Sequence, residues 1–237
     1  MPKITHDSDR IGNLDYESKL YIEQFLQCEL DDECNKLAIT SSGYLNILSK
    51  NVLFDDPIVK TLLSLSNNKL ILSYNTHNFI DNIPSSTNIL ILALTDYTNV
   101  KIDNLPANLK ELYISNEKVK DTGFWSDNNS HFNSSIDYLP STLEKLVIES
   151  YIFNQSFDNL PSTLKVLYIL SSEFTQSIDN LPQNLETLVI LSVSYTITDI
   201  HNLPPTLEYI RTSKNSIIDK NSDVLLKERP KLTIVID

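Results

Sequence analysis

The chain contains very little glycine, and this shortage excludes several classes of protein. Gly12, Gly43 and Gly123 are the three glycines among 237 residues, and each stands alone, whereas globular chains contain roughly 7%. No glycine-rich loop is present to cradle a phosphate, which excludes P-loop nucleotide hydrolases and GxGxxG dinucleotide-binding enzymes. For the same reason we expect turns that avoid the tight, positive-φ geometry.

Basic residues are scarce relative to acidic ones. The 19 Lys and Arg residues against 31 Asp and Glu residues give a net charge of -12. A chain this acidic binds nucleic acid and anionic membrane surfaces poorly, so neither is expected as a partner. The longest apolar runs, such as residues 89–94, fall far short of the roughly 20 residues that span a bilayer.

Cysteine and histidine are too few for a recognisable metal or catalytic site. Cys28 and Cys34, the two cysteines, are too isolated from histidine to form a zinc site. The four histidines stand in no recognisable relation to a Ser or Cys nucleophile. We therefore expect no enzyme activity, no metal and no cofactor. Residues 1–7 have no apolar signal-peptide core, which together with the free thiols favours a cytoplasmic location.

An internal repeat indicates the fold class. The block Ile-Asp-Asn-Leu-Pro, followed by Leu-x-x-Leu-x-Ile, begins at Ile102 and recurs from Ile136, Phe157 and Ile178 with small changes. Weaker copies begin at residues 80 and 200. Six of the ten prolines share one repeat position, with spacings of 22, 34, 21, 21 and 22 residues: Pro84, Pro106, Pro140, Pro161, Pro182 and Pro204. The long gap holds an insertion at 121–133.

The period of 21–22 residues lies in the range of leucine-rich repeats. Leu112, Tyr113 and Ile114 alternate as in a short strand, with Leu112 and Ile114 directed inward and Tyr113 outward. A second apolar set follows along the opposite wall, and the proline ends that wall without glycine. The repeat therefore predicts a leucine-rich-repeat-like solenoid with a short-stranded parallel β-sheet, because one coil cannot bury its own apolar ends.

We expect one strand per coil across a solenoid that extends over residues 69–237. The predicted strands are 70–72, 90–92, 112–114, 146–148, 167–169, 188–190, 210–212 and 232–235. Residues 213–237 are expected to form a C-terminal cap that contains a helix, N-capped by Ser222 and ending near Pro230, and the final strand.

Residues 153–164, Phe-Asn-Gln-Ser-Phe-Asp-Asn-Leu-Pro-Ser-Thr-Leu, resemble the FNIP repeat, a relative of the leucine-rich repeat. Residues 78–84 and 131–136 carry the same signature. The chain departs from this signature at three positions: Thr87 replaces a core leucine, His201 replaces the repeat aspartate, and Tyr138 replaces the repeat asparagine. FNIP repeats occur in social amoebae and giant DNA viruses, often after an F-box. The resemblance implies protein interaction rather than chemistry.

Residues 1–68 do not repeat and are predicted to form a helical N-terminal segment. Helices are expected at 20–26, at 31–39 with Asp31 or Asp32 as cap, at 44–48, and from Pro57 through Leu65. Three short helices of this kind resemble a degenerate F-box that lacks the usual Leu-Pro start, which implies a ubiquitin-ligase adaptor as partner. The alternative, compatible with the first, is a helical cap over the apolar end of the first repeat.

An aspartate recurs once per coil and has two interpretations: Asp81, Asp103, Asp137, Asp158 and Asp179. A stripe of carboxylates could hold a metal, but no calcium-loop pattern accompanies it. The simpler interpretation is structural, because an aspartate at a turn accepts hydrogen bonds from nearby backbone N–H groups. We favour the structural role.

The outward strand positions are the candidate binding surface. They form three columns that run from strand to strand. The middle column consists of Ile71, Ile91, Tyr113, Val147, Tyr168, Val189 and Arg211. The column two residues earlier in each strand consists of Lys69, Ile89, Glu111, Lys145, Val166, Thr187 and Tyr209, and the column two residues later consists of Ser73, Ala93, Ser115, Glu149, Leu170, Leu191 and Ser213. A contiguous apolar and aromatic patch is predicted at Val147, Val166, Tyr168, Leu170, Val189, Leu191 and Tyr209. Tyr113 and Arg211 complete the candidate partner-binding set on the sheet.

Phe124 and Trp125 in the insertion are a second candidate, since exposed aromatic side chains on a loop act as anchors. For Phe124 and Trp125, the competing interpretation is that both rings fold back onto the sheet edge. For the apolar sheet face, the competing interpretations are that its residues reflect β-propensity alone, or that the insertion or a second copy of the chain covers the face.

The sequence favours a non-enzymatic protein-interaction module, in its sharper form a substrate-recognition subunit of a cullin-type ubiquitin ligase. The alternative is a structural subunit of a stable, virus-encoded assembly.

Overall fold

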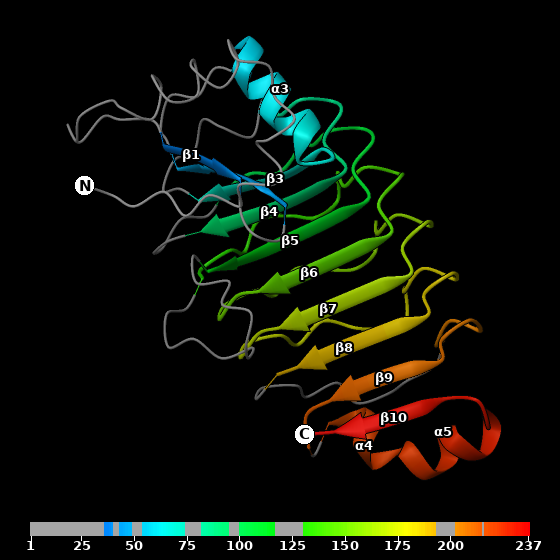
Figure 1. Cartoon of the computed structure of the whole chain (residues 1–237). Coiled ribbons are helices and arrows are strands. Elements are labelled where there is room, and N and C mark those ends of the chain that lie inside the picture. Colours follow the sequence, from blue (N-terminus) through cyan, green and yellow to red (C-terminus); the bar gives the residue numbers. More distant parts are fainter. Residues whose placement is uncertain are drawn as a thin grey trace.

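The computed structural model describes residues 36–39, 43–48, 54–73, 82–94, 100–116, 130–192, 202–214 and 216–237. They form a solenoid around one ten-stranded sheet whose strands follow the order of the chain (Figure 1). The strands are β1 (Lys36–Ile39), β2 (Leu45–Leu48), β3 (Lys69–Ser73), β4 (Ile89–Leu94), β5 (Glu111–Asn116), β6 (Lys145–Glu149), β7 (Val166–Leu170), β8 (Thr187–Leu191), β9 (Tyr209–Thr212) and β10 (Thr233–Ile236). The helices are α3 (Pro57–Leu65), α4 (Ile217–Lys220) and α5 (Ser222–Glu228).

The eight strands predicted from the repeat are confirmed as β3 to β10, and each pairs in parallel with the next. The register sets equivalent repeat positions side by side: Leu112 lies opposite Leu146, and Leu146 lies opposite Leu167. All three leucines are fully buried. Because side chains alternate along a strand, the Leu-x-Ile pattern directs two apolar residues per strand into the core.

The corner after each repeat proline is a turn that needs no positive φ. The N–H of Leu109 donates to the carbonyl of Pro106, and Leu164 donates to Pro161 in the same way. Within the described residues, a positive φ occurs at Gly43, Asn67 and Asn68, none of them in these corners. The expectation of turns built without glycine is confirmed for the described proline corners, because proline presets φ near −65°.

Phenylalanine side chains from the segments that follow the strands form one wall of the core. The rings of Phe132, Phe153 and Phe174 stack from coil to coil, with centroids 6.0 and 6.2 Å apart and nearly parallel planes. Phe157 adds a second contact to Phe174 at 4.9 Å. All four rings are buried, so this wall and the sheet leucines enclose one continuous core.

Two of the predicted N-terminal helices are wrong. The predicted helix at 31–39 contains β1, and the predicted helix at 44–48 coincides with β2. β1 pairs antiparallel with β2, and β2 pairs in parallel with β3, so both strands extend the sheet. Leu45 and Ile47 are buried in the same core as the repeats. The backbone pairing between neighbouring strands overrides the helical interpretation of these short apolar runs.

The helix predicted from Pro57 through Leu65 is confirmed as α3. Val59, Leu62 and Leu63 on it are buried in the common core. The sheet and the core are therefore continuous across residue 69, where the repeats begin. The predicted helix at 20–26 lies outside the described residues.

The C-terminal cap contains two short helices rather than one. Ser216 caps α4 by accepting a hydrogen bond from the N–H of Asp219. The predicted cap residue Ser222 is instead the first residue of α5, and its hydroxyl donates to the carbonyl of Asp219. The Arg229 guanidinium donates to the carbonyls of Leu203 and Pro204 and fixes the cap to the preceding coil.

Candidate protein-interaction face

The predicted outward columns lie in register across neighbouring strands. The middle column runs from Tyr113 through Val147, Tyr168 and Val189 to Arg211. The column before it contains Lys145, Val166, Thr187 and Tyr209, and the column after it contains Glu149, Leu170 and Leu191. The structure therefore brings the predicted sheet residues together on one face of β5 to β9.

The apolar part of this face forms a cluster separate from the main core. Leu170, Val189 and Leu191 pack together, and the rings of Tyr168 and Tyr209 pack against them. Val189 retains 2% of its surface, Leu170 7% and Leu191 8%. These three side chains support the face from beneath, while the two half-buried tyrosine rings present it to solvent. We refer to these five residues as the tyrosine platform.

On the side of strand β5 the face is polar, and its polar side chains contact one another. The Tyr113 hydroxyl donates to a Glu111 carboxylate oxygen at 2.6 Å, and the Lys145 ammonium lies 5.1 Å from the Tyr113 ring centroid. Lys69 lies over the Tyr44 ring in the same way, at 5.4 Å. Burial, with the Glu111 carboxylate beside it, raises the pKa of Tyr113 above its ordinary value. Tyr113 is thus held in place as a neutral phenol by contacts within its own face.

The other end of the middle column is also paired. The Arg211 guanidinium forms an ion pair with Asp237 at 2.7 Å. This hydrogen bond raises the pKa of Arg211 above its ordinary value. The predicted partner-binding role of Arg211 therefore competes with a contact that joins β9 to the end of β10.

Glu149 is a candidate residue that the sequence reasoning placed in a column but did not select. It is half-buried beside Leu170, its partner in the β6–β7 register. Burial raises the pKa of its carboxyl group. Among the described residues, no hydrogen bond or ion pair satisfies it. The signal in the sequence is a lone glutamate where later coils carry leucine.

The aspartate column has a structural role at Asp137 and Asp158. Ser135 donates to one oxygen of Asp137, and Asn159 of the next coil donates to the other at 3.0 Å. Asn180 donates to Asp158 in the same manner. The donors are side chains, so the expected acceptance from backbone N–H groups is wrong at these two positions. Hydrogen bonds with Ser135 and Asn159 lower the pKa of Asp137, and hydrogen bonds with Ser156 and Asn180 lower the pKa of Asp158.

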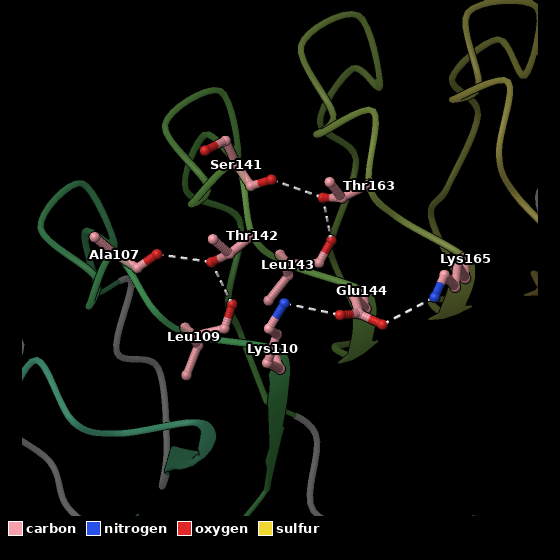
Figure 2. A network of polar contacts seen from close by, with 9 residues as sticks. All are labelled: Ala107, Leu109, Lys110, Ser141, Thr142, Leu143, Glu144, Thr163 and Lys165. Atoms are coloured by element: carbon pink, nitrogen blue, oxygen red, sulfur yellow. Dashed lines mark hydrogen bonds and ion pairs between the residues drawn. The ribbon is translucent and has the colours of Figure 1, made fainter.

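Other polar side chains tie consecutive coils together (Figure 2). The Thr142 hydroxyl lies 2.7 and 2.8 Å from the carbonyl oxygens of Ala107 and Leu109, and Thr163 repeats this contact one coil later. Glu144 accepts from Lys110 and Lys165 on its two neighbouring coils at 2.8 and 3.0 Å. The corners that precede the strands are therefore joined from coil to coil by polar contacts.

Neither a metal cluster nor a membrane span is found within the described ranges. No three His, Cys, Asp or Glu side chains gather there as metal ligands. No helix there is long and apolar enough to cross a bilayer. Phe124 and Trp125, the second predicted binding element, lie outside the described residues.

A scan against protein-family models finds no match to the chain. A search of curated proteins likewise finds no significant match.

Proposed function

We propose that the chain is a non-enzymatic protein-interaction solenoid that binds a partner through the tyrosine platform. The observation that carries this proposal is the pair of tyrosine rings, Tyr168 and Tyr209, seated on a buried aliphatic cluster on the solvent face of the sheet. Stacked-coil folds commonly present such extended sheet faces to partners. Tyrosine in a rigid, apolar setting is a favoured hot-spot residue.

The chemistry of the face indicates the kind of partner segment it accepts. The platform offers aromatic and aliphatic surface, and Glu149 offers a half-buried carboxylate at its margin. A partner that places an apolar side chain on the tyrosine rings and a Lys or Arg beside Glu149 would satisfy both. The net charge of -12 favours approach of such a basic segment.

The repeat chemistry supports assignment of the solenoid to the FNIP-repeat group. The Phe-Asn pair at 153–154 performs two tasks: the phenylalanine joins the stacked wall, and the Asn154 side-chain oxygen accepts from the N–H of Thr175 in the next coil. Asn133 accepts from the N–H of Asn154 in the same way. The F-box interpretation has weaker support, because residues 36–39 and 45–48 are strands. A ubiquitin-ligase role is therefore not part of this proposal.

Affinity capture with paired variants tests the proposed face. Tyr209→Ala removes a platform ring, and Tyr138→Ala removes a ring that is 69% exposed in a repeat turn rather than on the sheet face. Proteins retained by the unchanged chain and by Tyr138→Ala, but lost with Tyr209→Ala, would support the proposal. Equal retention by both variants would contradict it.

A further inference from the structure

Strand β10 lies at one edge of the sheet that the described residues form. It is the last strand in the sheet order and pairs with β9. The N–H groups of Thr233 and Asp237 donate to carbonyls of the β9 side. Because bonding direction alternates along a strand, the N–H and C=O groups of Ile234 and Ile236 point away from β9. No contact with another described residue satisfies them.

Apart from its short length of four residues, this edge strand lacks the usual features that prevent pairing with another chain. Natural edge strands are protected by charged residues, proline or a bulge. Residues 233–236, Thr-Ile-Val-Ile, contain no charge and no proline, and all four side chains are β-branched. Ile236 is 41% exposed, and Val224 and Leu226 on the adjacent α5 are 56% and 40% exposed. The edge is thus an apolar, β-prone template next to the C-terminal helices (Figure 1).

The charge at this end of the molecule is compatible with contact between identical chains. The whole chain carries -12, so two copies repel each other at long range. Residues 216–237 are balanced, with four acidic and four basic side chains: Asp219, Asp223, Glu228, Asp237, Lys220, Lys227, Arg229 and Lys231. Two copies that meet at this end therefore bring no local excess of like charge together.

We propose that β10 pairs antiparallel with β10 of a second copy and forms a two-fold symmetric dimer with one continuous sheet. Centred on Val235, this register sets Ile234 opposite Ile236 of the second copy, and each such pair exchanges two backbone hydrogen bonds. Val235 lies opposite Val235 of the second copy, with both side chains on the outward face of the sheet. Asp237 faces Thr233, so no like charges lie opposite each other. The edge is therefore complementary to itself, as a two-fold interface requires.

Sedimentation equilibrium of the full chain tests the dimer. Ile236→Pro removes the outward N–H from each copy but leaves the bonds of β10 to β9, and Ile236→Thr keeps the N–H and the β-branched shape. We expect a monomer–dimer equilibrium whose dissociation constant rises about 30-fold or more for the proline variant, because two hydrogen bonds are lost. Ile236→Thr should have a much smaller effect. A chain that stays monomeric, or forms oligomers that grow without limit, would overturn the proposal.

Disulfide trapping tests the register and does not depend on the proline variant folding. In a background with Cys28 and Cys34 replaced by serine, Val235→Cys brings two thiols together across the symmetry axis, at a spacing that a disulfide can bridge. Thr233→Cys sets its thiol opposite Asp237 and serves as the matched control. Covalent dimer from the first variant alone supports the register. Equal yields from both variants, or none from either, would contradict it.

Discussion

At the scale of single residues, Thr87 is the clearest departure from the repeat. It occupies the core position that Leu109 and Leu143 occupy in later coils, and it is fully buried. Among the described residues, its hydroxyl finds no hydrogen-bond partner. A buried hydroxyl without a partner costs free energy that an apolar group of the same shape does not. The sequence revealed the substitution, but the unsatisfied hydroxyl becomes visible in the packed coil.

Thr87→Val should therefore stabilise the fold by about 1–2 kcal/mol, because the shape is kept and the unsatisfied hydroxyl is removed. Thr163→Val is the matched control, since the Thr163 hydroxyl contacts two carbonyls and its loss should destabilise by about 1 kcal/mol. Urea denaturation monitored by circular dichroism measures both changes. A destabilised Thr87→Val variant would show that this position is not the dry core site described above.

Two glutamates should respond to pH with opposite signs. Burial raises the folded-state pKa of Glu149, so its ionised form reduces the free energy of unfolding as pH rises through that pKa. Hydrogen bonds and ion pairs with Lys110 and Lys165 lower the folded-state pKa of Glu144, so its contribution is present at neutral pH and is lost as pH falls through that pKa.

At pH 7, Glu149→Gln should raise the melting temperature and Glu144→Gln should lower it, each by a small amount because both sites are solvent-accessible. The Glu149→Gln difference should disappear once the pH is well below the ordinary glutamate pKa, whereas the Glu144→Gln difference should disappear only as pH falls through the lowered folded-state pKa of Glu144. Thermal melts across this pH range check the pair. The same sign for both variants at pH 7 would refute the assigned environments.

At the scale of elements, periodicity predicted the repeat strands well and the N-terminal ones poorly. The repeat aligns Leu112, Leu146 and Leu167 by their own spacing, so the strand pattern reinforces itself from coil to coil. Residues 45–48 stand alone, and a short apolar run fits a helix or a strand equally well. The Leu45-Asn46-Ile47 alternation, which matches Leu112-Tyr113-Ile114, was the available signal. Pairing with β3 decides the outcome, and that is a tertiary contact.

Leu45→Ala should destabilise the whole solenoid by about 2–5 kcal/mol, because Leu45 is fully buried in the common core. Leu167→Ala in the middle of the repeats should cost a similar amount. Chemical denaturation with probes at both ends of the chain measures the two variants. If Leu45→Ala left the unfolding of the repeats unchanged, residues 45–48 would belong to a separately folding unit instead.

At the scale of the whole molecule, polar ladders and apolar stacks join each coil to the next. The stacked rings of Phe132, Phe153 and Phe174 join the coils on one wall. The ion pairs of Glu144 with lysines of the two neighbouring coils join them at the N-terminal ends of the strands. This is the nearest-neighbour coupling expected of a solenoid. The repeat period sufficed to predict this architecture.

The candidate site could be predicted in part. The strand alternation placed Tyr168, Val189 and Tyr209 on one outward face, and the registers confirm that placement. Which of them remain accessible depends on how neighbouring side chains cover one another, and the sequence does not specify this. Val189 is covered, whereas the two tyrosine side chains that pack against the same cluster remain partly exposed.

The most direct test of the central claim is the affinity of the purified chain for a captured partner, measured by isothermal titration calorimetry. Tyr168→Ala and Tyr209→Ala should each weaken binding by about 2 kcal/mol, or roughly 30-fold, while the folded content measured by circular dichroism stays unchanged. Tyr138→Ala, on a repeat turn, should bind like the unchanged chain. Unaltered affinity in both platform variants would contradict the account.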